Sequence, residues 1–91
     1  MLDLVMTNQF QKDLKRMKKR GMDLSLLKRV LEILQAQKEL EGKYRDHALT
    51  GNYSGFRECH VQPDWLLVYT VHAEELILVA SRTGSHSDLF S

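Results

Sequence analysis

The order of apolar and polar positions predicts a short strand and then a helix at the start of the chain. In residues 2–6 the apolar side chains Leu2, Leu4 and Met6 fall on alternate positions, which favours a strand over a helix. In the next segment apolar side chains recur at i, i+4 and i+7, the spacing of one helix face: Phe10, Leu14 and Met17. Thr7 or Asn8 can cap this helix, and Gly21 is placed to end it.

The same reasoning predicts a second helix after Gly21. Asp23 is a plausible N-cap for it. Beyond this cap the apolar side chains form one broad stripe: Leu24, Leu26, Leu27, Val30, Leu31, Ile33 and Leu34. With a turn at Gly21, the two segments are expected to form a helical hairpin.

The last third of the chain is predicted to consist of strands. Residues 38–55 show little periodicity and are expected to form a long loop. Three apolar runs follow, separated by turn residues, at 56–61, 65–71 and 75–81. The predicted order is β-αα-βββ in a single domain, residues 1–91. This is an α+β fold with a helical hairpin on one face of a small, mainly antiparallel sheet.

Composition narrows the class of protein. With 91 residues, 43% hydrophobic and 27% charged, the chain is expected to form one globular domain and not a disordered segment. No apolar run approaches the roughly 20 residues that span a bilayer, and the N-terminus lacks the pattern of a secretory signal, so a cytoplasmic location is expected. Cys59 is the only cysteine, which excludes an intrachain disulfide and a cysteine-rich zinc site.

Charge is distributed unevenly along the chain. The net charge is only +1, but residues 1–50 hold 11 Lys and Arg against 7 Asp and Glu, whereas residues 51–91 hold 2 against 5. Contact with a nucleic acid would therefore depend on local basic positions and not on the field of the whole molecule.

The strand predicted over residues 56–61 is expected to carry chemistry on one face. Alternation places Glu58 and His60 on one side and Arg57 and Cys59 on the other. If the helices cover the Cys59 side, the Glu58 and His60 side is left open. Four more polar side chains are expected to gather there: His47, Asp64, Arg82 and His86.

Such a cluster has two plausible uses. Metal binding is the weaker one, because His47, His60 and His86 lack the i, i+3 or i+4 spacing that organises a pair of ligands. RNA cleavage by an attacking ribose 2′-hydroxyl is the other. It needs a general base, a general acid and positive charge on the phosphorane, all of which the cluster can supply without a metal.

Several segments carry a more specific signal. They are Tyr44-Arg45-Asp46-His47, Gly55-Phe56-Arg57-Glu58-Cys59-His60-Val61, Pro63-Asp64-Trp65 and Arg82-Thr83-Gly84-Ser85-His86, with Leu89-Phe90 after the last. In this order they resemble the YafQ-like toxins of the RelE/ParE superfamily, from bacterial type II toxin–antitoxin modules. The resemblance covers almost the whole chain. It implies the RelE-like fold and a ribosome-dependent mRNA endonuclease, an mRNA interferase that acts without metal or other cofactor.

The resemblance also implies site residues. His47, His60, Asp64, His86 and Phe90 stand at positions associated with activity in these toxins. We expect His86 to be the general acid, His60 or His47 to be the base, and Asp64 to orient a histidine. Phe90 is expected to stack on a base of the RNA.

Four further positions complete the expected site. Arg82 and Arg57 are expected to hold the scissile phosphate, and Trp65 either stacks on the substrate or packs in the core. Glu58 stands where the YafQ pattern has an aspartate, which leaves its role open.

The resemblance implies several partners. Basic helical positions are the candidates for contact with the ribosome: Lys12, Lys15, Lys18, Lys19, Arg20, Lys28 and Arg29. A cognate antitoxin of the DinJ/RelB kind is expected, in a heterotetramer that binds operator DNA through antitoxin residues. Two alternatives remain on the same fold: a ParE-like inhibitor of DNA gyrase, and a toxin-like protein without activity that only joins a regulatory complex.

Overall fold

The computed structural model describes residues 1–90. Its centre is a five-stranded sheet in the order β1-β5-β4-β3-β2, in which β1 pairs with β5 in parallel and the other neighbours are antiparallel. The strands are β1 (Asp3–Met6), β2 (His47–Ala48), β3 (Arg57–Gln62), β4 (Trp65–His72) and β5 (Ile77–Gly84). The first and last predicted strands are therefore neighbours, on the far side of the sheet from β2.

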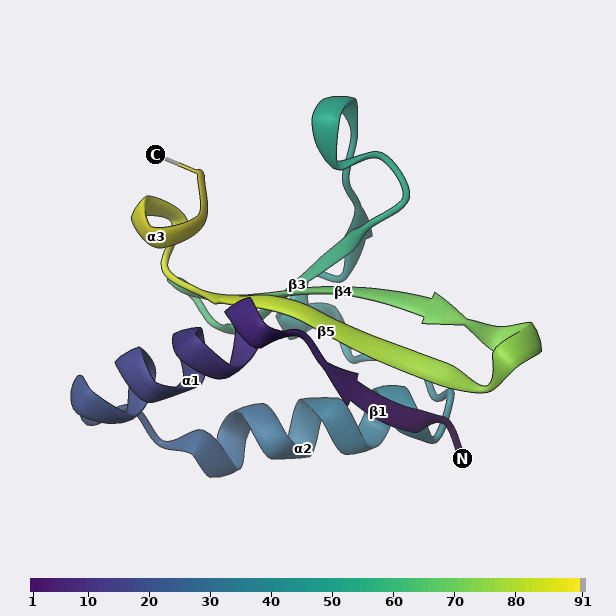
Figure 1. The fold of residues 1–91 in the computed structure, drawn as a ribbon, viewed down its shortest axis with the longest axis horizontal. Helices are drawn as coiled ribbons and strands as arrows, with labels where there is room; N and C mark the ends of the chain where they lie inside the picture. The colour runs from purple at the N-terminus through teal and green to yellow at the C-terminus, as the bar shows by residue number, and fades with distance from the viewer. Residues whose placement is uncertain (91) are drawn as a thin grey trace.

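Two helices cover one face of this sheet, as the apolar stripes predict (Figure 1). Helix α1 (Asn8–Lys19) is capped by the Thr7 side chain, and α2 (Leu24–Gln35) by that of Asp23. Their buried side chains meet those of β3, β4 and β5 in the main core, which includes Phe10, Leu27, Cys59, Trp65 and Tyr69. No helix within residues 1–90 is long and apolar enough to cross a membrane.

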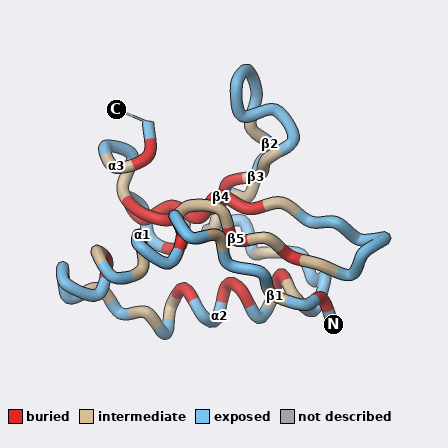
Figure 2. Tube along the Cα trace, in the orientation of Figure 1, coloured by how far each residue is buried: buried red, intermediate tan, exposed pale blue. Residues whose placement is uncertain are grey.

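The other face of the sheet carries a second, smaller core. Leu66 and Val68 of β4 pack there against Leu89, with Leu49 and Phe56 beside them. Leu89 belongs to α3 (His86–Phe90). Figure 1 shows α3 and the segment around β2 rising from this face, opposite α1 and α2, and Figure 2 shows that buried residues concentrate in the middle of the sheet. The open face is thus bordered by two raised segments.

Three parts of the chain differ from the prediction. Residues 38–55 are not one loop but contain strand β2 and the single 3₁₀ turns η1 (Gly42–Tyr44) and η2 (Gly51–Tyr53). The last strand begins at Ile77 and continues to Gly84, because Ala73–Glu75 forms a 3₁₀ turn and Leu76 takes a left-handed conformation. The expected tail after Gly84 is helix α3. These elements depend on tertiary pairing and capping more than on periodicity.

Candidate active site

The open face of β3 holds a carboxylate between two histidines. His47 is paired directly with Glu58 in the register of β2 and β3, and His60 follows Glu58 by two residues on the same face. One carboxylate oxygen of Glu58, Oε1, lies 3.6 Å from His47 Nε2 and 3.8 Å from His60 Nε2. Glu58 is 5% exposed, so its charge is shielded from water and faces the two imidazoles.

Backbone carbonyls orient both of these histidines. His47 Nδ1 lies 2.7 Å from the carbonyl oxygen of Arg45, and His60 Nδ1 lies 3.1 Å from that of Pro63. A carbonyl oxygen only accepts, so each Nδ1 carries the proton. Each Nε2 is then the atom that can take up a proton, and the imidazolium formed lies against Glu58. At 3.6 and 3.8 Å from the two Nε2 atoms, Glu58 stabilises such an imidazolium by its charge and not by a hydrogen bond.

His86 forms the other half of the cluster. It begins α3, and its Nδ1 lies 3.1 Å from Asp64 Oδ1, which also accepts a hydrogen bond from the His86 backbone N–H. These bonds hold the pKa of the Asp64 carboxyl below its usual range. Since Nδ1 donates to Asp64, Nε2 is left for a substrate. The rings of His60 and His86 are 5.9 Å apart, so the expected base and acid are neighbours.

Two aromatic side chains stand beside His86. Phe90, one turn further along α3, has its ring 6.4 Å from that of His86 and is 39% exposed. The ring of Tyr53, from η2, meets Phe90 edge-on at 5.2 Å and is also exposed. Exposed aromatic faces next to an acid–base pair can stack on a nucleobase. Phe90 was expected in the site from the sequence, whereas Tyr53 was not, because it lies in the segment predicted as a loop.

Helix α3 has only five residues and is held in place by charge. Ser85 and Asp88 cap each other across its first turn, and Arg20 of the α1 end donates two hydrogen bonds of 2.6 and 2.9 Å to Asp88. The Arg20 guanidinium holds the pKa of the Asp88 carboxyl well below its usual range. Gly84 lies so close that a Cβ there would stand 2.8 Å from Asp88 Oδ2. These contacts fix the helix that carries His86.

The guanidinium of Arg82 is paired with a buried carboxylate. Asp13 of α1 is fully buried and accepts hydrogen bonds from Arg82 Nε at 2.8 Å, from Arg82 Nη2 at 3.3 Å and from the Thr83 backbone N–H. Arg82 pairs with Val68, which pairs with Glu58, so Arg82 lies on the face that carries Glu58. It belongs to β5, whereas the sequence placed it after the last strand. Its expected contact with a phosphate is limited to the part of the guanidinium that Asp13 leaves free.

Arg57 and Trp65, two of the expected substrate contacts, do not lie on the open face with the histidines. Arg57 projects to the face opposite Glu58, where its Nη2 donates to Asp46 Oδ2 at 3.0 Å; Asp46 in turn accepts from the Tyr69 hydroxyl. The structure therefore does not bring Arg57 to the histidines.

Trp65 is fully buried and its indole N–H donates to the Thr83 hydroxyl at 2.9 Å. Of its two expected roles, packing is correct, because no ring face is exposed to a base.

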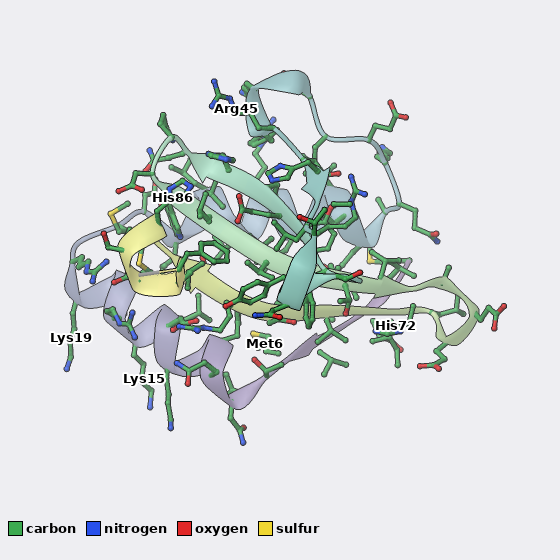
Figure 3. The ribbon with its side chains drawn as sticks, turned by 90° about the horizontal axis from the view of Figure 1, so that it is seen from above. Met6, Lys15, Lys19, Arg45, His72 and His86 are labelled. Carbon is green, nitrogen blue, oxygen red and sulfur yellow. The ribbon has the colours of Figure 1, made fainter. Side chains whose placement is uncertain are left out.

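Most of the basic helical positions are exposed. Figure 3 shows Lys15 and Lys19 projecting from α1 into solvent. The exposed set also includes Lys12, Lys18, Lys28 and Arg29. Arg20 differs, because Asp88 offsets its charge. Arg20 is thus a structural contact of α3 more than a free cation.

Metal binding is the other use that such a cluster can have. Within residues 1–90 no group of three or more His, Cys, Asp or Glu side chains is arranged to hold a metal ion. Cys59 lies under the helices, and burial raises the pKa of its thiol to about 12, so the reactive thiolate is scarce. The groups available for chemistry are the imidazoles and carboxylates of the open face.

Comparison with known proteins decides the family. The model of the YafQ toxins, described as bacterial toxins of type II toxin–antitoxin systems, matches residues 2–91. The chain belongs to the YafQ toxin family. It is 37% identical over 89 residues to the mRNA interferase toxin YafQ of Escherichia coli strain K12, which covers 97% of this chain and 95% of that protein.

Solved structures show the same fold. The YafQ crystal structure from E. coli strain BL21(DE3) has a TM-score of 0.91 at 35% identity and covers all of both chains. YafQ in the E. coli DinJ–YafQ complex has a TM-score of 0.89 at 36% identity, again over both whole chains. A metal-bound toxin from Helicobacter pylori has a TM-score of 0.93 at 47% identity, covering 99% of this chain and 100% of that one. The resemblance and the RelE-like α+β fold are confirmed.

Proposed function

We propose that this YafQ-family protein is the toxin of a type II toxin–antitoxin pair and cleaves mRNA as an endoribonuclease. The observation that carries the proposal is the pair His60 and His86, whose rings are 5.9 Å apart and which are each backed by a carboxylate, Glu58 and Asp64. Such a pair can accept one proton and donate another across a single phosphodiester. The curated relative of 37% identity is itself an mRNA interferase toxin.

The proposed reaction is attack by a ribose 2′-hydroxyl on its own 3′-phosphate. His60 Nε2 takes the 2′-hydroxyl proton while the 2′-oxygen forms a bond to phosphorus. The bond from phosphorus to the 5′-oxygen of the next nucleotide breaks, and His86 Nε2 gives that oxygen its proton. The products are a 2′,3′-cyclic phosphate and a free 5′-hydroxyl. No redox partner or water is consumed.

The structure favours His60 over His47 as the base. Both histidines direct Nε2 at Glu58, but only the ring of His60 lies next to that of His86. His86 is the residue that protonates the leaving oxygen. His47 lies in β2, paired with Glu58 across the sheet, and its Nε2 faces the same carboxylate oxygen. We assign His47 to positioning Glu58. Arg82 supplies positive charge near the phosphate, and Phe90 with Tyr53 stacks on a base.

The remaining parts of the proposal concern location and partners. The reaction takes place in the cytoplasm on mRNA held by a translating ribosome, which the exposed lysines of α1 and α2 contact. A cognate antitoxin of the DinJ kind neutralises the toxin in a heterotetramer that binds operator DNA through the antitoxin. Support comes from the E. coli relative, whose structure was solved in complex with DinJ.

Induction in bacterial cells tests the proposal against gyrase inhibition. We expect wild-type protein to stop growth and to produce mRNA fragments with 5′-hydroxyl ends, and His86→Gln to do neither. His72→Gln is the matched control, because His72 is an exposed histidine at the far end of β4, away from His86 (Figure 3). Intact mRNA together with gyrase-dependent DNA damage on induction of the wild type would overturn the proposal.

A further inference from the structure

A pocket beside His60 is lined by residues that, apart from His60, have no role in the reaction described above. It lies where β3 passes beyond the end of β2 and has a volume of about 590 Å³. Its lining comes from α2, from the η1 segment and from the turn after β3, and includes Leu26, Lys43, Tyr44, Arg45, His60 and Pro63. A pocket of this size is large enough for a nucleotide.

The pocket shares one residue, His60, with the proposed active site. His60, the proposed base, forms part of its wall, whereas His86 does not. The segment that supplies the basic wall also orients the other histidine, because the Arg45 carbonyl accepts the hydrogen bond from His47 Nδ1. An RNA strand that leaves the active site on the His60 side would therefore enter this pocket.

The chemistry of the lining suits a phosphate joined to a planar apolar group. Lys43 and Arg45 are exposed, and within residues 1–90 neither has a carboxylate within 4 Å. Asp46, the acidic residue next to Arg45 in sequence, is bonded to Arg57 and Tyr69 instead. The Lys43 ammonium lies 5.1 Å from the centre of the Tyr44 ring. Cations without a carboxylate partner, beside aromatic and apolar side chains, are typical of sites for single-stranded nucleic acid.

We propose that this pocket binds the nucleotide immediately upstream of the cleaved bond, with its phosphate on Lys43 and Arg45 and its base against the apolar side chains of Leu26, Tyr44 and Pro63. The direction follows from the proposed function, on which this inference rests. The attacking 2′-hydroxyl belongs to the upstream side of the cut and faces His60, while the leaving 5′-oxygen belongs to the downstream side and faces His86. The phosphate held is the one 5′ to the attacking ribose.

Single-turnover cleavage of an mRNA on programmed ribosomes tests this contact by a double-mutant cycle. We expect Arg45→Gln and Lys43→Gln each to slow cleavage about 10-fold, the size of one charge-assisted hydrogen bond. Lys38→Gln, which removes an exposed charge in the preceding loop, is the matched control and keeps the wild-type rate. A neutral methylphosphonate at the phosphate 5′ to the attacking ribose removes both contacts, so it should slow the wild type about 100-fold but slow Arg45→Gln only about 10-fold further, the share of Lys43.

The outcomes separate this inference from the proposed function. If the wild type does not cleave RNA, the proposed function fails and the subsite fails with it. If the wild type cleaves, and the Arg45 and methylphosphonate effects multiply independently, only the subsite is overturned. If Arg45→Gln cleaves at the wild-type rate but binds the antitoxin more weakly, the pocket is a protein-binding site and the RNA assignment is wrong. Circular dichroism of each variant establishes that it is folded.

Discussion

At the scale of single residues, Glu58 is the group on which the histidine arrangement depends. It is buried, and both neighbouring imidazoles direct Nε2 at the same oxygen. A proton taken up by His60 is therefore stabilised by a nearby negative charge in a site with little water. The Glu58 carboxylate lies within 4 Å of both imidazoles.

Replacing Glu58 by glutamine tests this role. The amide keeps the size of the side chain but not its charge, so we expect cleavage to slow while remaining faster than in His60→Gln, for which removal of a general base costs about 10²- to 10⁴-fold. Single-turnover rates at saturating protein measure both. Glu75→Gln, an exposed glutamate of η3, is the control. Equal rates for wild type and Glu58→Gln would show that the charge is not used.

Residue positions in the site were partly predictable. Alternation along β3 correctly separated Glu58 and His60 from Cys59, because period two is a strong signal in a half-covered strand. Asp13 was missed, since a run of charged residues on α1 looked like a solvated face. Its signal was its spacing, midway between Phe10 and Met17 on the apolar stripe. Only the fold reveals that Arg82 from β5 is its partner.

At the scale of elements, α3 is the part of the fold that places His86. A helix of five residues is unstable alone, so its position depends on the Ser85–Asp88 cap, on Arg20 and on Leu89 in the smaller core. The sequence pattern Ser85-x-x-Asp88 was a visible capping signal, but the ion pair with Arg20 joins residues 68 apart in sequence. Long-range contacts of this kind are not readable from periodicity.

A methyl group at Gly84 should displace α3. In Gly84→Ala the new Cβ would stand 2.8 Å from Asp88 Oδ2, so the carboxylate or the helix must move. A shift of about 1 Å in a catalytic group costs about 10²-fold in rate, and we expect a loss of that order in single-turnover cleavage. Gly42→Ala is the matched control, because nothing lies within 4 Å of its Cβ position. Unchanged cleavage by Gly84→Ala would show that α3 tolerates displacement.

The ion pair of α3 also makes stability depend on pH. Arg20 lowers the pKa of Asp88 in the folded protein relative to about 3.9 in the unfolded chain. The stabilisation is therefore fully present above roughly pH 5 and is lost as the pH falls through the folded pKa. Thermal unfolding of wild type and Asp88→Asn should differ most at pH 7 and progressively less towards pH 3. A difference independent of pH would contradict this account.

At the scale of the whole molecule, positive charge is concentrated on the helices and chemistry on the opposite face of the sheet. The exposed lysines of α1 lie in the helical layer, whereas α3, which begins with His86, and the segment around β2 lie on the other face of the sheet (Figure 1). This division was readable in the sequence as a basic first half and an acidic second half. Because of this uneven distribution, a protein of net charge +1 can approach a polyanion with its helical side.

Neutralising part of the helical charge tests ribosome docking. We expect the triple variant Lys12→Gln, Lys15→Gln and Lys19→Gln to bind ribosomes more weakly, with the slope of log affinity against log salt reduced by about 2, as for three lost contacts to phosphates. Cleavage at saturating ribosome concentration should be retained, because these exposed side chains belong to α1, on the other face of the sheet from α3. A slope equal to that of the wild type would place the docking surface elsewhere.

The measurement that tests the central claim most directly is single-turnover cleavage of a ribosome-bound mRNA with one 2′-deoxyribose at the cut position. If His60 and His86 transfer protons for an attacking 2′-oxygen, the natural mRNA is cut to a 2′,3′-cyclic phosphate and a 5′-hydroxyl, and the deoxy substrate stays intact at that position. Cleavage of the deoxy substrate at the same bond would contradict the account, because the attacking oxygen would then come from water.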